Sequence, residues 1–173
     1  MKTISCLAAS VLCLALFALG CDSPAATNSG ANATYQGKGP LKIVCTTGMV
    51  ADLAKNIAGE RAEVTHLMGA GIDPHLYKPS PADVAALSSA DVVFYSGLHL
   101  EGKMTDLFEQ LATTKPCVAV ADKIDHDKLL EAGGLHDPHV WFDVNLWTQA
   151  GKEVTNTLVK FDPAGEKDYQ TRE

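Results

Sequence analysis

Residues 41–57 read LKIVCTTGMVADLAKNI, and the spacing of their apolar residues changes part-way along. The run from Leu41 to Thr46 is almost continuously apolar, which is typical of a strand buried on both faces. Met49, Leu53 and Ile57 then recur at helical spacing. This stretch therefore predicts a buried strand followed at once by a helix.

The same alternation continues toward the C-terminus. Further apolar runs predict strands at 62–68, 91–95 and 117–120 and a short one at 140–142. Alternating strands and helices predict an α/β fold with an open, mostly parallel sheet flanked by helices. In such folds ligands bind outside the carboxyl ends of the strands.

Two helices are expected between these strands. Ser80 and Pro81 form a helix start of the capping-box type, with Val84 and Leu87 on the apolar face that follows. Residues 100–112 predict the second helix, because apolar residues recur on one side of it. Glu101 and Lys103 are expected on the solvated face of that second helix.

The first forty residues have a different composition. Residues 1–20 combine a basic start with a long apolar run and end at Gly20, the pattern of a secretory signal peptide. Cys21 follows directly, which predicts cleavage before it and lipidation; an ordinary signal peptide with an incidental cysteine is the alternative. Residues 21–40 are rich in small polar residues and are expected to form a lipidated, flexible tether.

Two further cysteines lie in the expected folded part. Cys45 and Cys117 each occur in an apolar, strand-like run. Buried free thiols behave as small hydrophobes, and this is the favoured interpretation. A disulfide between them is the open alternative, because an exported protein meets an oxidising compartment.

The C-terminal residues 144–173 predict helices. Asp143 is expected to cap a long amphipathic helix over 145–160, which ends at Asp162-Pro163. The sequence stops inside the helix that follows. We therefore expect a truncated chain, with one α/β lobe at 41–143 followed by a helical segment at 144–173.

Composition and motifs limit the partners that this chain can have. The formal net charge is -7, and lysines and arginines are scattered, which excludes a nucleic-acid-binding protein. The sequence has no Walker motif, so any ATPase that works with this chain is a different protein.

The most informative feature is a repeated tripeptide. Asp73-Pro74-His75 and Asp137-Pro138-His139 lie in different expected loops. Proline restricts its own backbone and that of the preceding residue, so each histidine is presented from a stiff loop. Imidazole is a common ligand of zinc and of other first-row metals, and Asp73 and Asp137 are placed to hold the second ring nitrogen.

The tripeptides alone leave other interpretations open. A histidine in a loop is more often solvated than metal-bound, and two histidines do not complete a zinc site. A zinc hydrolase that uses His75 and His139 is a second hypothesis. Such enzymes usually carry H-E-x-x-H on one helix, which this sequence lacks. An adhesion lipoprotein is a third hypothesis, and a truncated product that binds no metal is a fourth.

Five stretches carry a family resemblance, and two of them are highly specific. These are GIDPHLYKPSPADVA at 71–85 and LHDPHVWFDVN at 135–145; the others lie at 44–56, at 90–103 and in the helix with Trp147. The chain resembles the metal-binding solute receptors of zinc and manganese ABC importers, of the ZnuA/TroA/PsaA type. The resemblance covers nearly all of the expected folded part.

This resemblance implies a function and a site. It implies that His75 and His139 are the first two metal ligands, while a third histidine and a carboxylate lie on a second lobe. It also implies a non-enzymatic, monomeric lipoprotein, held outside the cytoplasm by its lipid anchor on the membrane. Such a receptor delivers its ion to an ABC permease and the ATPase of that permease.

Other residues near the expected site receive weaker assignments. His99 is expected to pack near the cleft or to support the ligands from behind, and His136 to be solvated or near the ion. Trp141 and Phe142 are expected to pack beneath the second ligand loop. The resemblance implies zinc or manganese as the transported ion; the short segment at 121–135 argues mildly against zinc receptors with a long histidine-rich loop.

Overall fold

The computed structural model describes residues 34–173. The expected signal peptide, the lipidation site Cys21 and most of the expected tether lie outside the described residues. Four parallel strands form the central sheet in the order β2-β1-β3-β4. The strands are β1 (Leu41–Thr47), β2 (Ala62–Met68), β3 (Val92–Tyr95) and β4 (Cys117–Ala119), and a small antiparallel hairpin comprises β5 (Glu131–Ala132) and β6 (Leu135–His136).

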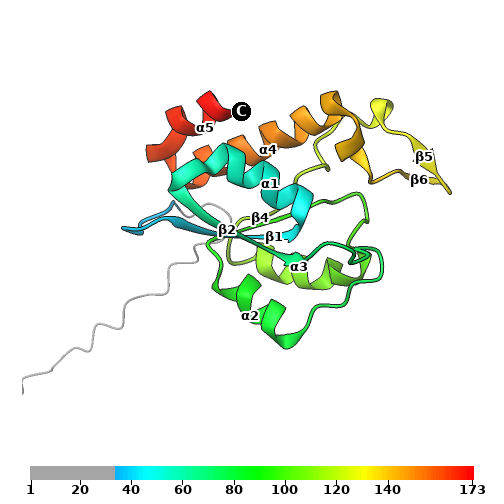
Figure 1. The fold of residues 1–173 in the computed structure, drawn as a ribbon, viewed down its shortest axis with the longest axis horizontal. Coiled ribbons are helices and arrows are strands. Elements are labelled where there is room, and N and C mark those ends of the chain that lie inside the picture. Colours follow the sequence, from blue (N-terminus) through cyan, green and yellow to red (C-terminus); the bar gives the residue numbers. More distant parts are fainter. Residues whose placement is uncertain (1–33) are drawn as a thin grey trace, which may run out of the picture.

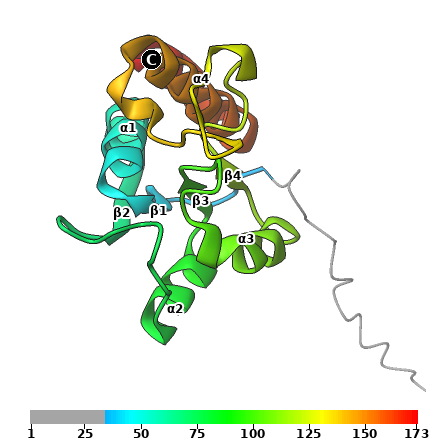
Figure 2. The same cartoon turned by 90° about the vertical axis from the view of Figure 1, so that its right-hand side faces the viewer.

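Helices cover both faces of this sheet, which confirms the predicted open α/β architecture (Figures 1 and 2). One face carries α1, α4 and α5, and the other carries α2 and α3. The helices are α1 (Gly48–Ala58), α2 (Pro81–Ser89), α3 (Thr105–Ala112), α4 (Val144–Phe161) and α5 (Glu166–Arg172). Within residues 34–173, no helix has both the length and the apolar character needed to cross a membrane.

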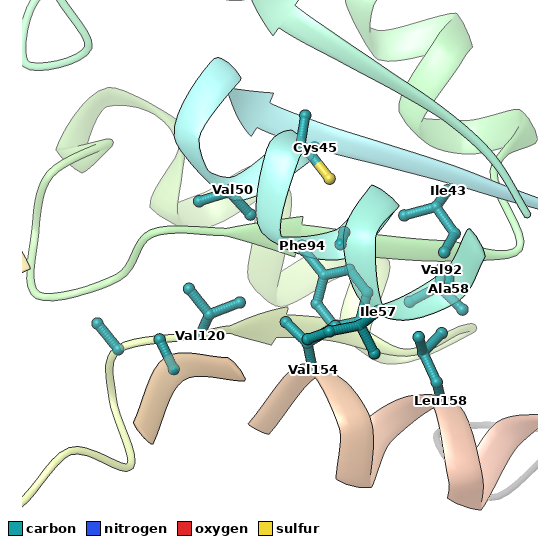
Figure 3. Packing of buried hydrophobic residues seen from close by; sticks show 14 of the residues in the cluster. Ile43, Cys45, Val50, Ile57, Ala58, Val92, Phe94, Val120, Val154 and Leu158 are labelled. Carbon is teal, nitrogen blue, oxygen red and sulfur yellow. The ribbon is translucent and has the colours of Figure 1, made fainter. Parts of the chain in front are cut away.

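The larger core lies between the sheet and α1 and α4. Figure 3 shows Phe94 of β3 among Ile57, Val120 and Val154, which come from three other segments. Leu146, Ala150, Val154 and Leu158 are buried along one face of α4, as the periodicity predicts. Burial of each large side chain contributes about 1.5–3 kcal/mol, so α4 is held firmly against the sheet.

An ion-pair network fixes the end of the chain against this layer. Arg61 lies in the 3-10 turn η1 (Gly59–Arg61), and its Nη2 atom is 2.7 Å from Asp162 Oδ2. The hydroxyl of the buried Tyr169 donates to the same Asp162 oxygen at 2.6 Å. The hydrogen bonds that Arg61 donates to Asp162 and Tyr169 raise the pKa of Arg61 above its usual range. Helix α5 is therefore tied to the turn that follows α1.

Helix starts follow the expected local chemistry. Ser80 accepts a hydrogen bond from Asp83 N while Asp83 accepts one from Ser80 N, which is the capping box expected before α2. Asp143 accepts from the backbone N–H groups of Asn145 and Leu146 at the start of α4, which confirms its predicted cap.

Three local expectations were wrong. Residues 140–142 form the 3-10 turn η4 (Val140–Phe142) and not a strand. The helix expected at 100–112 begins later, because η2 (Gly102–Met104) precedes α3. In α2, Leu87 is fully buried but Val84 is exposed, so only one of the two residues expected on its apolar face packs into the core.

Cys45 and Cys117 are both free thiols. β3 separates β1 from β4, so the strands that carry the two cysteines lie about 9.5 Å apart, twice the usual strand spacing. Cys45 belongs to the core beneath α1, whereas Cys117 packs against the core on the opposite face. A disulfide requires Cα atoms closer than about 7 Å, so this geometry excludes the pairing.

Candidate metal centre

The two Asp-Pro-His loops meet outside the sheet. His75 lies in the loop between β2 and α2, and His139 lies between β6 and η4. Their Nε2 atoms are 3.4 Å apart and their ring centroids 5.3 Å apart. Two imidazoles from distant parts of the sequence therefore point the same ring nitrogen at one place.

Each tripeptide builds the same local turn. Asp73 Oδ1 accepts a hydrogen bond from His75 N at 2.9 Å, and Asp137 Oδ1 accepts one from His139 N at 3.0 Å. The intervening proline has no N–H and does not compete for the carboxylate. The aspartate thus fixes the backbone of the histidine two residues later, which presents the ring in a defined direction.

The two aspartates differ in what else they bind. Asp137 Oδ1 lies 2.5 Å from His139 Nδ1, so Nδ1 donates to the carboxylate, and in a neutral ring this arrangement leaves the free lone pair on Nε2. Hydrogen bonds from the His139 backbone and side chain lower the pKa of Asp137. The side chain of Asp73, by contrast, accepts a hydrogen bond from the backbone N–H of His75. Only Asp137 binds the ring of its histidine, although the sequence predicted this contact for both aspartates.

Neighbouring side chains support both loops. The Trp141 ring meets the His139 ring edge-on, with centroids 5.2 Å apart. Phe142, however, is 82% exposed, so the expectation that it packs beneath the loop was wrong. On the other side, the Tyr77 hydroxyl donates to Asp83 Oδ2 at 2.8 Å and joins the His75 loop to α2. Apart from the place of Tyr77 in the motif, nothing in the sequence predicted this role.

The distance between the Nε2 atoms fits a shared metal ion. Zinc binds imidazole nitrogen at about 2.0–2.1 Å, and two corners of a tetrahedron of that size are about 3.3–3.4 Å apart. The observed 3.4 Å matches this spacing. Among residues 34–173, no group of three or more His, Cys, Asp or Glu side chains is arranged to hold a metal. The described residues thus supply two ligands.

The family assignment rests on most of the chain. The sequence profile of the family described as "Zinc-uptake complex component A periplasmic" matches residues 43–173. The chain belongs to this family. The description of this family names a periplasmic component of a zinc-uptake complex.

Individual relatives agree with the family. Manganese-binding lipoprotein MntA of Bacillus subtilis (strain 168) is 47% identical over 160 residues, covering 91% of this chain and 50% of MntA. Zinc-binding protein TroA of Treponema pallidum (strain Nichols) is 42% identical over 142 residues, covering 82% of this chain and 46% of TroA. The solved structure of the periplasmic zinc binding protein TroA from Treponema pallidum has a TM-score of 0.74 at 41% identity, covering 78% of this chain and 49% of that chain. This chain thus spans about half the length of the curated relatives it matches.

Glu101 lies between the carboxyl ends of β1 and β3 and not on a solvated helix face. Its side chain is 3% exposed, so the sequence-based expectation was wrong. Oε1 accepts from Thr46 Oγ1 at 2.6 Å and from Ser96 N at 2.8 Å, and Oε2 accepts from Gly97 N at 3.3 Å. Burial raises the pKa of Glu101, and these hydrogen bonds oppose the shift. The carboxyl group therefore joins the ends of β1 and β3.

His99 and His136 line a cavity that does not include the histidine pair. Both line a cavity of about 650 Å³, together with His126 and Asp122, and neither His75 nor His139 belongs to that lining. The rings of His126 and His136 are 4.6 Å apart, and His136 Nδ1 is buried without a hydrogen-bond partner. Their roles as supporting or cleft residues stay predictions.

We expect Asp137→Asn to lower metal affinity by about 10- to 100-fold, the usual cost of losing a carboxylate behind a histidine ligand. Asparagine keeps an acceptor for the backbone of His139 but removes the negative charge that makes the ring a stronger ligand. Competition titration with a chromophoric chelator measures the change. Asp73→Asn is the matched control, because Asp73 bonds only the backbone in this structure, and its effect is expected to be several-fold smaller. Equal losses in the two variants would contradict the asymmetry.

Proposed function

We propose that this chain captures a divalent transition metal, zinc or manganese, and delivers it to an ABC import permease. The observation that carries the proposal is the 3.4 Å separation of His75 Nε2 and His139 Nε2, which fits two ligands of one ion. Membership of the zinc-uptake family supports it independently. The names of relatives that bind manganese and zinc support the choice of these two ions.

Each part of the pair has a physical task in capture. The carboxylates of Asp73 and Asp137 accept hydrogen bonds from the backbone N–H groups of the two histidines and hold the loops before the ion arrives, so little conformational entropy is lost on binding. Asp137 keeps the proton of His139 on Nδ1, which leaves Nε2 as the donor atom. Nitrogen ligands favour zinc over manganese, so oxygen ligands beyond this pair would decide whether manganese is taken.

The proposed receptor also needs a place to act and a way to release its ion. The receptor acts outside the cytoplasm, anchored to the membrane through lipidated Cys21, and works with a permease and an ATPase encoded separately. Both imidazoles are exposed at the protein surface, which leaves the ion accessible to a docking partner. The hydrolase hypothesis gains no support, because the carboxylate of Asp137 is bound to Nδ1, on the far side of the ring from Nε2.

The test is metal uptake by cells. In medium depleted of metal, deletion of the gene is expected to abolish high-affinity uptake of radioactive zinc or manganese. Re-expression of the natural gene should restore uptake, whereas re-expression with both His75→Ala and His139→Ala should not. Normal uptake in the deleted strain, or full rescue by the double variant, would refute capture and delivery by this protein.

A further inference from the structure

The loop that carries His75 is fixed differently from the loop that carries His139. Asp137 binds the ring of His139 directly, whereas Asp73 accepts its hydrogen bond from the backbone of His75. Most residues of 71–76 are exposed, so this stretch has little packing of its own. The place of the His75 ring therefore depends on what holds the loop as a whole.

Tyr77 joins this loop to the body of the protein. Its ring is half-buried and packs against the core on the side of the sheet that carries α2 and α3. Its hydroxyl donates to Asp83 Oδ2 at 2.8 Å, and the same oxygen accepts from Ser80 N at 2.7 Å. A hydrogen bond to an ionised acceptor is stronger than one between neutral groups. The loop thus has an apolar and a polar anchor two residues after His75.

Helix α2 can serve as the platform for this anchor because its other end is fixed as well. Leu87 is the one buried residue of α2, so apolar packing alone would hold the helix weakly. The ammonium group of Lys115, which lies between α3 and β4, donates to Leu87 O at 3.2 Å and to Ala90 O at 2.6 Å. A cation at the C-terminal end of a helix is favourable. Contacts therefore run without a break from the start of β4 through α2 to the loop of His75.

We propose that Tyr77 is a positioning residue for metal capture, whose hydrogen bond to Asp83 keeps His75 Nε2 where it can share an ion with His139. This inference rests on the proposed function, because it concerns the same two ligands. The 3.4 Å between the two Nε2 atoms matches the spacing of two zinc ligands. Such a site works only while each ligand stays within about 0.5 Å of its productive place, so a small shift of the loop would spoil the pair.

Tyr77→Phe removes the hydroxyl and keeps the ring in the core. If the freed loop occupies the binding position about one-tenth of the time, the apparent zinc affinity falls about 10-fold. Once bound, the ion itself holds the loop through His75. The loss should therefore appear in the association rate and leave the dissociation rate nearly unchanged. Stopped-flow measurements of zinc binding and zinc release by the full-length protein give both rates.

A second readout needs no metal. Leu76 N donates to Asp73 O at 3.3 Å and closes the turn around His75. In the metal-free protein, exchange of this amide with solvent, followed by NMR, should be several-fold faster in Tyr77→Phe. The acceptor can be tested too: Asp83→Ala with Tyr77→Phe should cost no more zinc affinity than Asp83→Ala alone, because both changes break one contact.

Tyr169→Phe is the matched control for stability. Tyr169 also donates its hydroxyl to a carboxylate, Asp162 Oδ2 at 2.6 Å, and it lies in α5 beside Arg61, just before β2. Its loss removes a comparable hydrogen bond at the opposite end of the strands from the histidine pair. Tyr169→Phe should lower stability and leave zinc association unchanged. Equal losses of zinc affinity in Tyr169→Phe and Tyr77→Phe would mean that stability alone is responsible, and would overturn the proposal.

The remaining outcomes separate this inference from the proposed function. A normal zinc association rate or normal amide exchange in Tyr77→Phe overturns the positioning role and leaves His75 and His139 standing as ligands. So does a loss of affinity that lies in the dissociation rate. A wild-type protein that binds neither zinc nor manganese overturns the proposed function, and the role of Tyr77 falls with it.

Discussion

Zinc affinity is expected to fall at least about 100-fold when either His75 or His139 is replaced by alanine. The two Nε2 atoms lie 3.4 Å apart, so each ring is a direct ligand of the same ion in the proposed site. Loss of a direct ligand should exceed the 10- to 100-fold cost of losing a residue that only supports one. Competition with a chromophoric chelator of known affinity measures the loss for zinc and manganese.

The double variant sharpens this prediction. A single imidazole cannot chelate, so His75→Ala with His139→Ala is expected to cost little more than either change alone. His66→Ala is the matched control, because it removes an exposed histidine elsewhere on the sheet. Additive losses in the double variant would mean that the two rings bind different ions. Unchanged affinity in both single variants would refute the site.

Much of the fold could be predicted from short segments of the sequence. β2 has the predicted bounds, and α1 follows β1 at once, because the apolar spacing changes there from strand to helix. The Ser80 capping box and the Asp143 cap were predictable for the same reason, since each depends on residues within one turn. Features decided by a few neighbouring residues are the ones that sequence reasoning recovers.

The candidate site was predictable only in part. The repeated tripeptide indicated two stiff loops, and the parallel sheet indicated that loops at its carboxyl edge lie close together. The sequence did not indicate that Asp137 would hold its histidine ring while Asp73 holds only backbone. That difference depends on ring orientation, which the surrounding tertiary contacts determine.

Glu101 shows why the rest escaped prediction. The apolar periodicity begins at Leu100, but Gly97, Leu98 and His99 all have positive φ, and this left-handed turn delays the helix. Positive φ is rare for residues other than glycine, so the sequence carried no signal for it. The turn directs the Glu101 side chain toward the sheet, where it accepts hydrogen bonds from Thr46 of β1 and from Ser96 N just after β3.

Glu101→Ala is expected to lower the free energy of unfolding by about 3–5 kcal/mol, since up to three buried donors lose their acceptor and each costs about 1–3 kcal/mol. These donors are the Thr46 hydroxyl and the N–H groups of Ser96 and Gly97. Urea denaturation followed by circular dichroism measures the change. Glu109→Ala, at an exposed position of α3, is the matched control and should cost less than about 0.5 kcal/mol. Equal stability of the two variants would show that the Glu101 hydrogen bonds contribute nothing.

Glu101→Gln separates the charge of this group from its hydrogen bonds. Burial raises the pKa of Glu101 above its usual value, so the folded protein binds this proton more tightly than the unfolded chain does. The stabilisation from the protonated carboxyl is complete below the unfolded pKa and is lost as pH rises through the raised folded value. Glutamine cannot ionise, so the variant should lack this loss while wild type shows it in denaturation curves at successive pH values. If both proteins lose stability in parallel over that range, the carboxyl of Glu101 is not the group that titrates there.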